Sequence, residues 1–406
     1  MAGPGPIVII GAGQAGAWVA ATLREEGFDG SLTLVGDEGH VPYERPPLSK
    51  EVLAGDQPVE TTHMHDRAFY DEKNIDLRLG IAAQAIDLEG RLVSLSDGAA
   101  LPYDKLVIAT GARARRLDVP GADLAGVHTL RGIDDMAAIR GDLGGGAHAV
   151  IIGGGYIGLE VAATARKLGC RVTVLEALDR VMNRVVAPEV GEIYAETHRQ
   201  NSVELRLGVG VAGFEGDERA TRVRLADGST LDGDAFIVGV GALPNVELAA
   251  AAGLAVDNGI VVDEFGRTSD GHVVAAGDVS NHPNPILGRR IRLESWQNAQ
   301  NQAITAARAL LGETEPYGEV PWFWSTQYDL NLQMVGLPEA WDALVWRGDV
   351  GEKKFSVFYL ADGVMVGANC INSARDVRPA RTFIADKRIV DPAALADTGT
   401  QLKKLL

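Results

Sequence analysis

The chain has few cysteines and no long apolar run, and both absences exclude whole classes of protein. Only Cys170 and Cys370 occur among 406 residues. This excludes a disulfide scaffold, a CxxC redox pair, a four-cysteine iron–sulfur site and a CxxCH haem site, and we predict no metal ligand. No apolar run reaches the ~18 residues that a membrane span needs. The N-terminus shows no charged segment of a signal peptide, so we expect a cytoplasmic protein without a membrane partner.

Basic residues are scarce relative to acidic ones. Lys plus Arg number 38 against 55 for Asp plus Glu, which gives a formal net charge of −17. Such acidity argues against nucleic acid or an anionic membrane surface as the main partner. The length is that of a chain with two or three domains.

Glycine, in contrast, is abundant, with 49 residues, and it recurs in two matching motifs. In the first, an apolar run at 7–10 predicts a buried strand, a G-x-G-x-x-G turn and a helix follow, and a second strand at 32–35 ends beside Asp37. The motif glycines are Gly11, Gly13 and Gly16. This is the dinucleotide fingerprint in its required context, with its glycines placed for a tight turn, for approach to a pyrophosphate and for helix packing. Asp37, or Glu38 beside it, is predicted to bind an adenosine ribose.

The second motif repeats this pattern later in the chain. A strand at 148–152 precedes the turn, a helix is predicted over 159–168, and a strand at 171–175 leads to Glu176. The motif residues are Gly153, Gly155, Tyr156, Ile157 and Gly158. An acid at position 176 favours a ribose 2′-hydroxyl and repels a 2′-phosphate, which predicts NADH rather than NADPH. Two fingerprints predict two dinucleotides, and the natural pair is FAD and NADH.

Two further apolar runs end at small residues that a ligand could approach. Residues 106–108 run into Ala109, Thr110 and Gly111, and 273–276 run into Gly277 and Asp278. A carboxylate directly after a buried strand needs hydroxyl or amide donors, so Asp278 is a candidate ligand contact.

With these motifs and several longer ones, the chain resembles the FAD- and NADH-dependent ferredoxin reductases of the putidaredoxin reductase type. The runs that carry the resemblance are RPPLSK at 45–50, GGGYIGLE at 153–160, AAGD at 275–278, ESW at 294–296 and PWFWSTQYD at 321–329. The resemblance extends almost from end to end. It implies an α/β fold with two Rossmann-like dinucleotide-binding domains, arranged as in glutathione reductase, and a C-terminal α+β domain.

The same resemblance implies domain boundaries and an activity. The expected FAD-binding domain is 1–112 plus 245–315, the NADH-binding domain is 113–244, and the C-terminal domain is 316–406. The implied activity is electron transfer from NADH through FAD to a small [2Fe–2S] ferredoxin that serves a cytochrome P450 or a Rieske oxygenase. Two alternatives stay open: an NADH:rubredoxin reductase, and a binding flavoprotein similar to apoptosis-inducing factor.

The resemblance also implies a set of site residues. Lys50 is expected near the flavin N5 edge, paired with Glu160, and these two are the predicted catalytic residues. Pro47 is expected against one flavin face. The predicted cofactor-binding residues are Gly11, Gly13, Ala15, Gly16, Asp37, Pro47, Lys50, Ala83, Ala109, Thr110, Gly111, Arg131, Gly153, Gly155, Tyr156, Ile157, Gly158, Glu176, Gly241, Asp278 and Trp296.

The two cysteines bear on the mechanism. Neither lies in the stretch 41–50 beside the predicted flavin, and both are predicted to be buried apolar side chains. This excludes the glutathione-reductase and thioredoxin-reductase mechanisms, which need a cysteine pair, and the NADH-peroxidase type, which uses one flavin-facing cysteine.

A partner surface is predicted from local charge and aromatic residues. Because net charge opposes an acidic ferredoxin, we expect a basic patch with an apolar centre. Arg289, Arg290 and Arg292 form the densest basic cluster, and Trp322 or Trp324 would lie near the electron exit.

Overall fold

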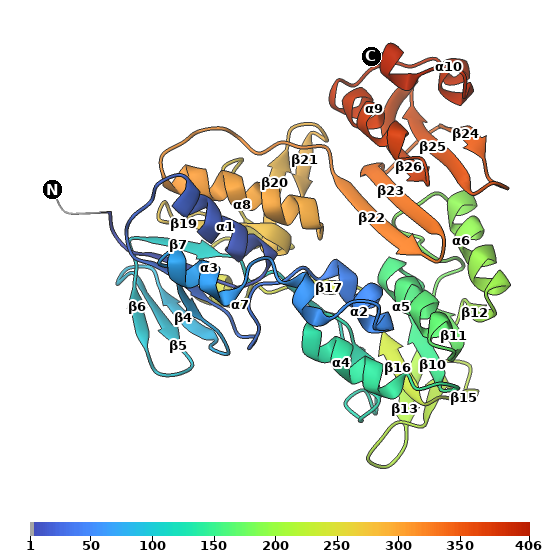
Figure 1. The fold of residues 1–406 in the computed structure, drawn as a ribbon, viewed down its shortest axis with the longest axis horizontal. Helices are drawn as coiled ribbons and strands as arrows, with labels where there is room; N and C mark the ends of the chain where they lie inside the picture. The colour runs from blue at the N-terminus through green and yellow to red at the C-terminus, as the bar shows by residue number, and fades with distance from the viewer. Residues whose placement is uncertain (1–3) are drawn as a thin grey trace.

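The computed structural model describes residues 4–406 and contains three units, each built around its own five-stranded sheet (Figure 1). Two of the sheets are parallel and the third is antiparallel. Within residues 4–406, no helix is long and apolar enough to cross a membrane.

The first parallel sheet combines early and late parts of the chain. Its order is β19-β7-β1-β2-β3, and its strands are β1 (Ile7–Ile10), β2 (Leu32–Val35), β3 (Asp76–Arg78), β7 (Lys105–Ile108) and β19 (Val273–Ala275). Helices α1 (Gln14–Glu25) and α8 (Trp296–Leu310) pack on one face, and α3 (Arg67–Glu72) lies beside β3. The other face packs against α7 (Glu247–Ala251) and an antiparallel sheet of β4 (Ala83–Asp87), β5 (Leu92–Leu95) and β6 (Ala100–Pro102). Burial on both faces explains why the central strand β1 is an uninterrupted apolar run and why its neighbours β2 and β7 are mostly apolar.

The second parallel sheet has the order β12-β11-β10-β16-β9. Its strands are β9 (Val127–Thr129), β10 (His148–Ile152), β11 (Arg171–Glu176), β12 (Val203–Leu207) and β16 (Ala235–Val238). The helices of this unit are α4 (Ile133–Asp142), α5 (Tyr156–Lys167) and α6 (Pro188–Gln200). The opposite face packs against the antiparallel strands β13 (Val211–Glu215), β14 (Arg222–Leu225) and β15 (Thr230–Asp232).

The predicted bounds of the helix after the second glycine motif are wrong. The sequence indicates 159–168, whereas α5 spans Tyr156–Lys167, with Gly155 as its N-cap. The last residues of the glycine motif are themselves helical, because the helix begins directly after its N-cap Gly155, and the amides of its first turn have no partner within the helix. Gly169, at φ +84°, follows the helix and suits the left-handed conformation of a helix end.

Short segments join the two parallel-sheet units. Strands β8 (Ala112–Ala114) and β17 (Ala242–Pro244) pair antiparallel where the chain leaves the first unit and returns to it. The 3₁₀ turn Pro46–Ser49 and helix α2 (Glu51–Ala54) extend from the first unit onto α4 and α5. A small sheet of β18 (Ile260–Val261), β20 (Ser280–Asn284) and β21 (Arg289–Ile291) precedes α8.

The C-terminal unit is an antiparallel sheet with helices, and with it the predicted fold class is confirmed. Its order is β22-β23-β26-β25-β24, and its strands are β22 (Trp322–Gln327), β23 (Leu330–Gly336), β24 (Ala343–Asp349), β25 (Lys354–Ala361) and β26 (Val364–Ile371). Helix α9 (Ala374–Ala385) covers one face, and α10 (Pro392–Ala396) contacts β24. The other face shares a core with α5 and α6, as Figure 1 shows. This contact brings β22 close to the second glycine motif.

Candidate dinucleotide-binding site

The two glycine motifs have nearly the same backbone geometry. Gly11 has φ +109° and Gly153 has φ +108°, a conformation that side chains disfavour. A Cβ added at Gly16 would lie 1.9 Å from the carbonyl oxygen of Gly11, and one at Gly158 would lie 2.2 Å from that of Gly153. The first and third glycines are therefore required by the turn and by the close approach of helix and loop.

The middle glycines differ from these, because nothing in the protein fills the space beside them. A Cβ added at Gly13 or Gly155 would meet no protein atom within 4 Å. Both residues are N-caps in extended conformation, without a side-chain hydrogen bond to the first turn. Ala15 is buried in the first turn of α1, and Ile157 is 38% exposed in that of α5. Each loop therefore presents free helix-start amides to an open space, as an anionic pyrophosphate requires.

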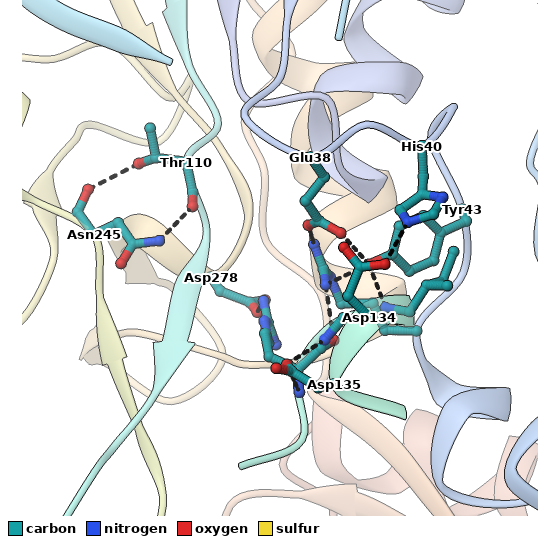
Figure 2. A network of polar contacts seen from close by, with 12 residues as sticks. Glu38, His40, Tyr43, Thr110, Asp134, Asp135, Asn245 and Asp278 are labelled. Atoms are coloured by element: carbon teal, nitrogen blue, oxygen red, sulfur yellow. Dashed lines mark hydrogen bonds and ion pairs between the residues drawn. The ribbon is translucent and has the colours of Figure 1, made fainter. Parts of the chain in front are cut away.

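Two acids follow β2: Glu38 is hydrogen-bonded within the protein, and Asp37 is exposed to solvent. The Glu38 carboxylate accepts hydrogen bonds from the Tyr43 hydroxyl and the Arg45 guanidinium, as Figure 2 shows. Burial would raise the pKa of Glu38, but Arg45 and Tyr43 outweigh it and hold the pKa below its usual range. Asp37 is exposed and faces outward at the end of β2. Of the two acids proposed from the sequence, Asp37 is therefore the one free to bind a ribose.

Ala83 lies close to this acidic loop. The backbone amide of Ile81 donates to the carbonyl oxygen of Gly36 at 2.9 Å. The backbone amide of Gly80 donates to the carbonyl oxygen of Glu38, also at 2.9 Å. These bonds hold the start of β4 against the end of β2. Position 83 therefore stays a candidate for an adenine contact through its backbone.

In the second unit, the Glu176 carboxylate stabilises the glycine loop through hydrogen bonds to backbone amides. Its carboxylate accepts the backbone amides of Gly154 at 2.6 Å and Leu178 at 2.8 Å. A carboxylate has about four acceptor positions, so two remain for a ribose diol. Gly241, at φ +107°, lies beyond β16, where an added Cβ would lie 3.6 Å from Arg184. The structure thus places Glu176 and Gly241 at the carboxyl edge of the second sheet, near the loop.

The carboxyl ends of β7 and β19 meet an arginine. The guanidinium of Arg131 donates to the Asp278 carboxylate at 2.9 Å and lies 3.5 Å from the Cβ position of Gly111. Thr110 and Asn245 exchange two hydrogen bonds of 2.8 Å beside them, as Figure 2 shows. Arg131 therefore supplies a hydrogen-bond donor for the Asp278 carboxylate, and it lies at the carboxyl ends of β7 and β19.

Lys50 and Glu160 lie 110 positions apart in the chain and are in direct contact. The Lys50 ammonium is 2.9 Å from Glu160 Oε2, and the two side chains are 13% and 4% exposed. Glu160 also accepts from the hydroxyls of Ser49 at 2.5 Å and Ser325 at 2.7 Å. Pro47 is the second residue of the 3₁₀ turn Pro46–Ser49, which directly precedes Lys50. One buried carboxylate thus joins the first unit, α5 and β22.

Aromatic side chains begin two helices of the site, α5 and α8. Tyr156 packs on Phe323, with ring centroids 4.4 Å apart, and Glu294, Glu160 and Asp278 lie close enough to add to the burial that raises its pKa. Trp296 is the first residue of α8, and its indole donates to the Glu44 carboxylate at 3.2 Å.

Comparison with known proteins agrees with this geometry over the whole chain. Residues 5–303 match the pyridine nucleotide-disulphide oxidoreductase family, and residues 322–406 match the reductase C-terminal family. The chain belongs to the pyridine nucleotide-disulphide oxidoreductases. Rhodocoxin reductase of Rhodococcus erythropolis is 44% identical, covering 98% of this chain and 93% of that one. Putidaredoxin reductase of Pseudomonas putida is 41% identical, covering 98% and 96%.

A solved structure extends the comparison to three dimensions. The covalent putidaredoxin reductase–putidaredoxin complex matches with a TM-score of 0.96 at 40% identity, covering 100% of this chain and 98% of that one. The resemblance to ferredoxin reductases seen in the motifs is thereby confirmed, and the chain is a ferredoxin-reductase-type member of its family.

This oxidoreductase departs from the disulphide in its family's name. Cys170 and Cys370 are free thiols and fully buried, as predicted, and burial raises the pKa of both. Cys170 follows α5 and Cys370 lies in β26, so neither is in a glycine loop or beside Lys50. Both thiols are therefore packed in the core, as the sequence predicts.

The residues of the site fit the family's cofactors, FAD and NADH. The open faces of Gly13 and Gly155 leave room for a pyrophosphate at each loop. The Arg131 Nε is buried and has no hydrogen-bond partner among residues 4–406, which is expected of a group that a bound cofactor completes. Glu176 is the last residue of β11, and Asp37 lies two residues beyond the end of β2, so each unit has an acid at the carboxyl end of the strand that follows its glycine motif.

Several residues of the site were not found by the sequence reasoning. Tyr43, Arg45, Asn245 and Ser325 belong to no glycine motif, yet they hold Glu38, Thr110 and Glu160 in place. Arg45 and Ser325 do lie in the family-like runs at 45–50 and 321–329. Polar residues inside such runs were the available signal.

The arginine cluster has less free charge than its sequence suggests. Arg289 pairs with Glu339 at 2.9 Å, and Arg292 pairs with Glu294 at 2.8 Å. Arg290 donates to two backbone carbonyls. Its role in binding a partner stays a prediction.

Proposed function

We propose that this chain takes hydride from NADH onto FAD and passes the electrons to a small [2Fe–2S] ferredoxin that serves a cytochrome P450 or Rieske oxygenase. The observation that carries this is the pair of matched glycine loops, each open to a pyrophosphate, together with the buried Lys50–Glu160 pair that joins the first unit to α5. Full-length similarity to ferredoxin reductases supports the acceptor.

The first loop holds FAD and the second holds NADH. In the first unit, the proposed contacts are Gly11, Gly13, Ala15, Gly16, Asp37, Pro47, Lys50, Ala83, Ala109, Thr110, Gly111, Arg131, Asp278 and Trp296. In the second, they are Gly153, Gly155, Tyr156, Ile157, Gly158, Glu176 and Gly241. The corresponding domains are 1–112 with 245–315 for FAD, 113–244 for NADH, and 316–406 at the C-terminus. The separate sheets of the three units support this division.

Bound FAD supplies the redox chemistry, since a flavin accepts two electrons as hydride and releases them one at a time. The protein orients and tunes it. The Lys50 ammonium is fixed by a buried carboxylate, and a cation held in this way stabilises negative charge that develops beside it. Glu176 keeps the second glycine loop in shape and leaves two acceptor positions for the ribose of NADH.

The proposal is tested by mixing the FAD-loaded protein with NADH under anaerobic conditions and then adding an acceptor. We expect the yellow flavin to bleach with NADH, faster than with NADPH, and its colour to return on addition of oxidised [2Fe–2S] ferredoxin. Rubredoxin serves as the comparison acceptor. A protein that takes up no FAD, or one that reduces rubredoxin but no ferredoxin, would contradict the proposal.

We also propose a cytoplasmic location. Two buried cysteines that remain free thiols support a reducing compartment. Fractionation of cells should find the chain with cytoplasmic markers, and its recovery with membranes or periplasm would exclude this location.

A further inference from the structure

A line of buried polar side chains leads away from the Lys50–Glu160 pair. Ser325 donates to Glu160 at 2.7 Å, and the Gln327 amide lies 3.2 Å from the Ser325 hydroxyl. Gln327 Oε1 is 2.9 Å from His198 Nε2, and His198 Nδ1 is 3.3 Å from the Tyr328 hydroxyl. Ser325, Gln327 and His198 are at most 1% exposed. The line crosses from β22 to α6, so it joins the C-terminal sheet to the second unit.

The direction of every hydrogen bond in this line is fixed by chemistry. Gln327 Oε1 can only accept, so His198 carries its proton on Nε2. Burial lowers the pKa of His198 to about 4, so the ring is neutral at neutral pH and its Nδ1 accepts from Tyr328. The amide nitrogen of Gln327 can only donate, so the Ser325 proton is free for the carboxylate. All four donors therefore point toward Glu160, and aligned hydrogen bonds of this kind strengthen one another.

The end of the line is held by an unusual backbone conformation. Tyr328 has φ +52° in the turn between β22 and β23, and a bulky residue rarely adopts this region. In this conformation the Tyr328 ring makes an edge contact with His198, with an angle of 65° between the ring planes and centroids 5.0 Å apart. The fold thus maintains local strain where the line ends, which is common for segments that position functional groups.

We propose that His198 is a positioning residue for electron transfer: through Gln327 and Ser325 it fixes the hydrogen bond to Glu160, and thereby the place of the Lys50 ammonium. This rests on the function proposed above. Without the imidazole donor, the Gln327 amide can turn over, and its oxygen then accepts the Ser325 proton. Glu160 loses that donor while it remains buried, and the Lys50 ammonium is no longer held in one position.

The test compares FAD-loaded full-length variants. His198→Leu removes the donor, His198→Gln keeps an N–H near Nε2, and Ser325→Ala removes the last link. We expect His198→Leu to slow flavin reduction by NADH about tenfold, a typical size for coupling within one hydrogen-bonded network. Its flavin midpoint potential should shift in the same direction as that of Ser325→Ala. His198→Gln should return the rate to within about threefold of the unmodified chain.

Two comparisons separate positioning from a structural role. His282 is a second buried histidine whose ring nitrogens have no partner among residues 4–406, so His282→Leu should leave rate and potential unchanged. The double variant of His198→Leu with Ser325→Ala should be no slower than Ser325→Ala alone. Additive effects, or an unchanged potential in His198→Leu, would overturn the proposal.

Gln327→Leu removes the link between His198 and Ser325 by a change in β22. It tests the proposal even if His198→Leu does not fold. If the unmodified chain fails to oxidise NADH, the proposed function fails. The potentials of the variants then still decide whether His198 acts on the flavin site.

Discussion

Replacing Gly155 with alanine separates the stability of the chain from its capacity to bind NADH. The added Cβ would meet no protein atom within 4 Å, and the φ of −74° and ψ of 172° are open to any residue. At Gly158 the same change would bring Cβ to 2.2 Å from the Gly153 carbonyl oxygen. Gly158→Ala is therefore a matched control in which the damage is to the fold.

The magnitudes follow from these contacts. Glycine to alanine at a compatible conformation stabilises a protein by about 0.4–1 kcal/mol, because the unfolded chain loses freedom. We expect Gly155→Ala to raise the free energy of unfolding by that amount. Its methyl group lies in the space open to a pyrophosphate. Loss of one or two charge-assisted hydrogen bonds, at about 1.5–3 kcal/mol each, weakens NADH binding at least tenfold.

The assay combines thermal unfolding of the FAD-loaded variants with flavin reduction at a series of NADH concentrations. Gly155→Ala should melt no lower than the unmodified chain, retain its FAD and require at least about tenfold more NADH for half-maximal reduction. Gly158→Ala should melt lower. Unchanged NADH binding in Gly155→Ala would refute the assignment of the second loop, and a lower melting temperature would refute the open space beside it.

Three further outcomes are expected. Glu176→Gln should lower kcat/KM for NADH about tenfold to a hundredfold and narrow the preference for NADH over NADPH. Asp179 is an exposed acid in the segment that follows β11, and Asp179→Asn should change neither kcat/KM nor the preference. Lys50→Met leaves the Glu160 carboxylate buried without its cation, so we expect a loss of about 3–5 kcal/mol in the free energy of unfolding, measured by denaturant titration, and slower flavin reduction in stopped flow. Burial lowers the pKa of His282 to about 4, against roughly 6.5 in an unfolded chain, so the unfolded chain takes up this proton first as pH falls. Stability should therefore decrease from about pH 6.5 to 4, by up to about 1.4 kcal/mol per pH unit, and melting curves of His282→Phe should show a shallower decrease.

Local pattern was sufficient for much of the fold. The four residues of β1 are buried on both faces, and this burial is what makes its sequence uniformly apolar. The turn glycines could also be identified from local sequence. At Gly11 and Gly16 an added Cβ would collide with backbone atoms, so only glycine fits there. The start of α5 at Tyr156 was missed because a residue inside a glycine motif carries no helix signal of its own.

The site depended more on contacts between distant segments. Nothing in the local sequence links Lys50 with Glu160, and the pair was suggested by family resemblance alone. The clamp of Arg45 on Glu38 is tertiary in the same way, because its geometry depends on how the loop after β2 folds back. The left-handed conformation of Tyr328 could not be predicted from the sequence either, because tyrosine is not a residue that favours a positive φ.

The way the C-terminal sheet is attached determines how it could be exchanged between relatives. Besides Ser325 and Gln327, Tyr359 crosses to the second unit, where its hydroxyl accepts the Ala187 amide at 2.9 Å. A chimera that imports this sheet from another reductase would need donors and acceptors that match α5 and α6. The sheet therefore cannot be transplanted alone, and inheritance of the sheet and of helices α5 and α6 is expected to be linked.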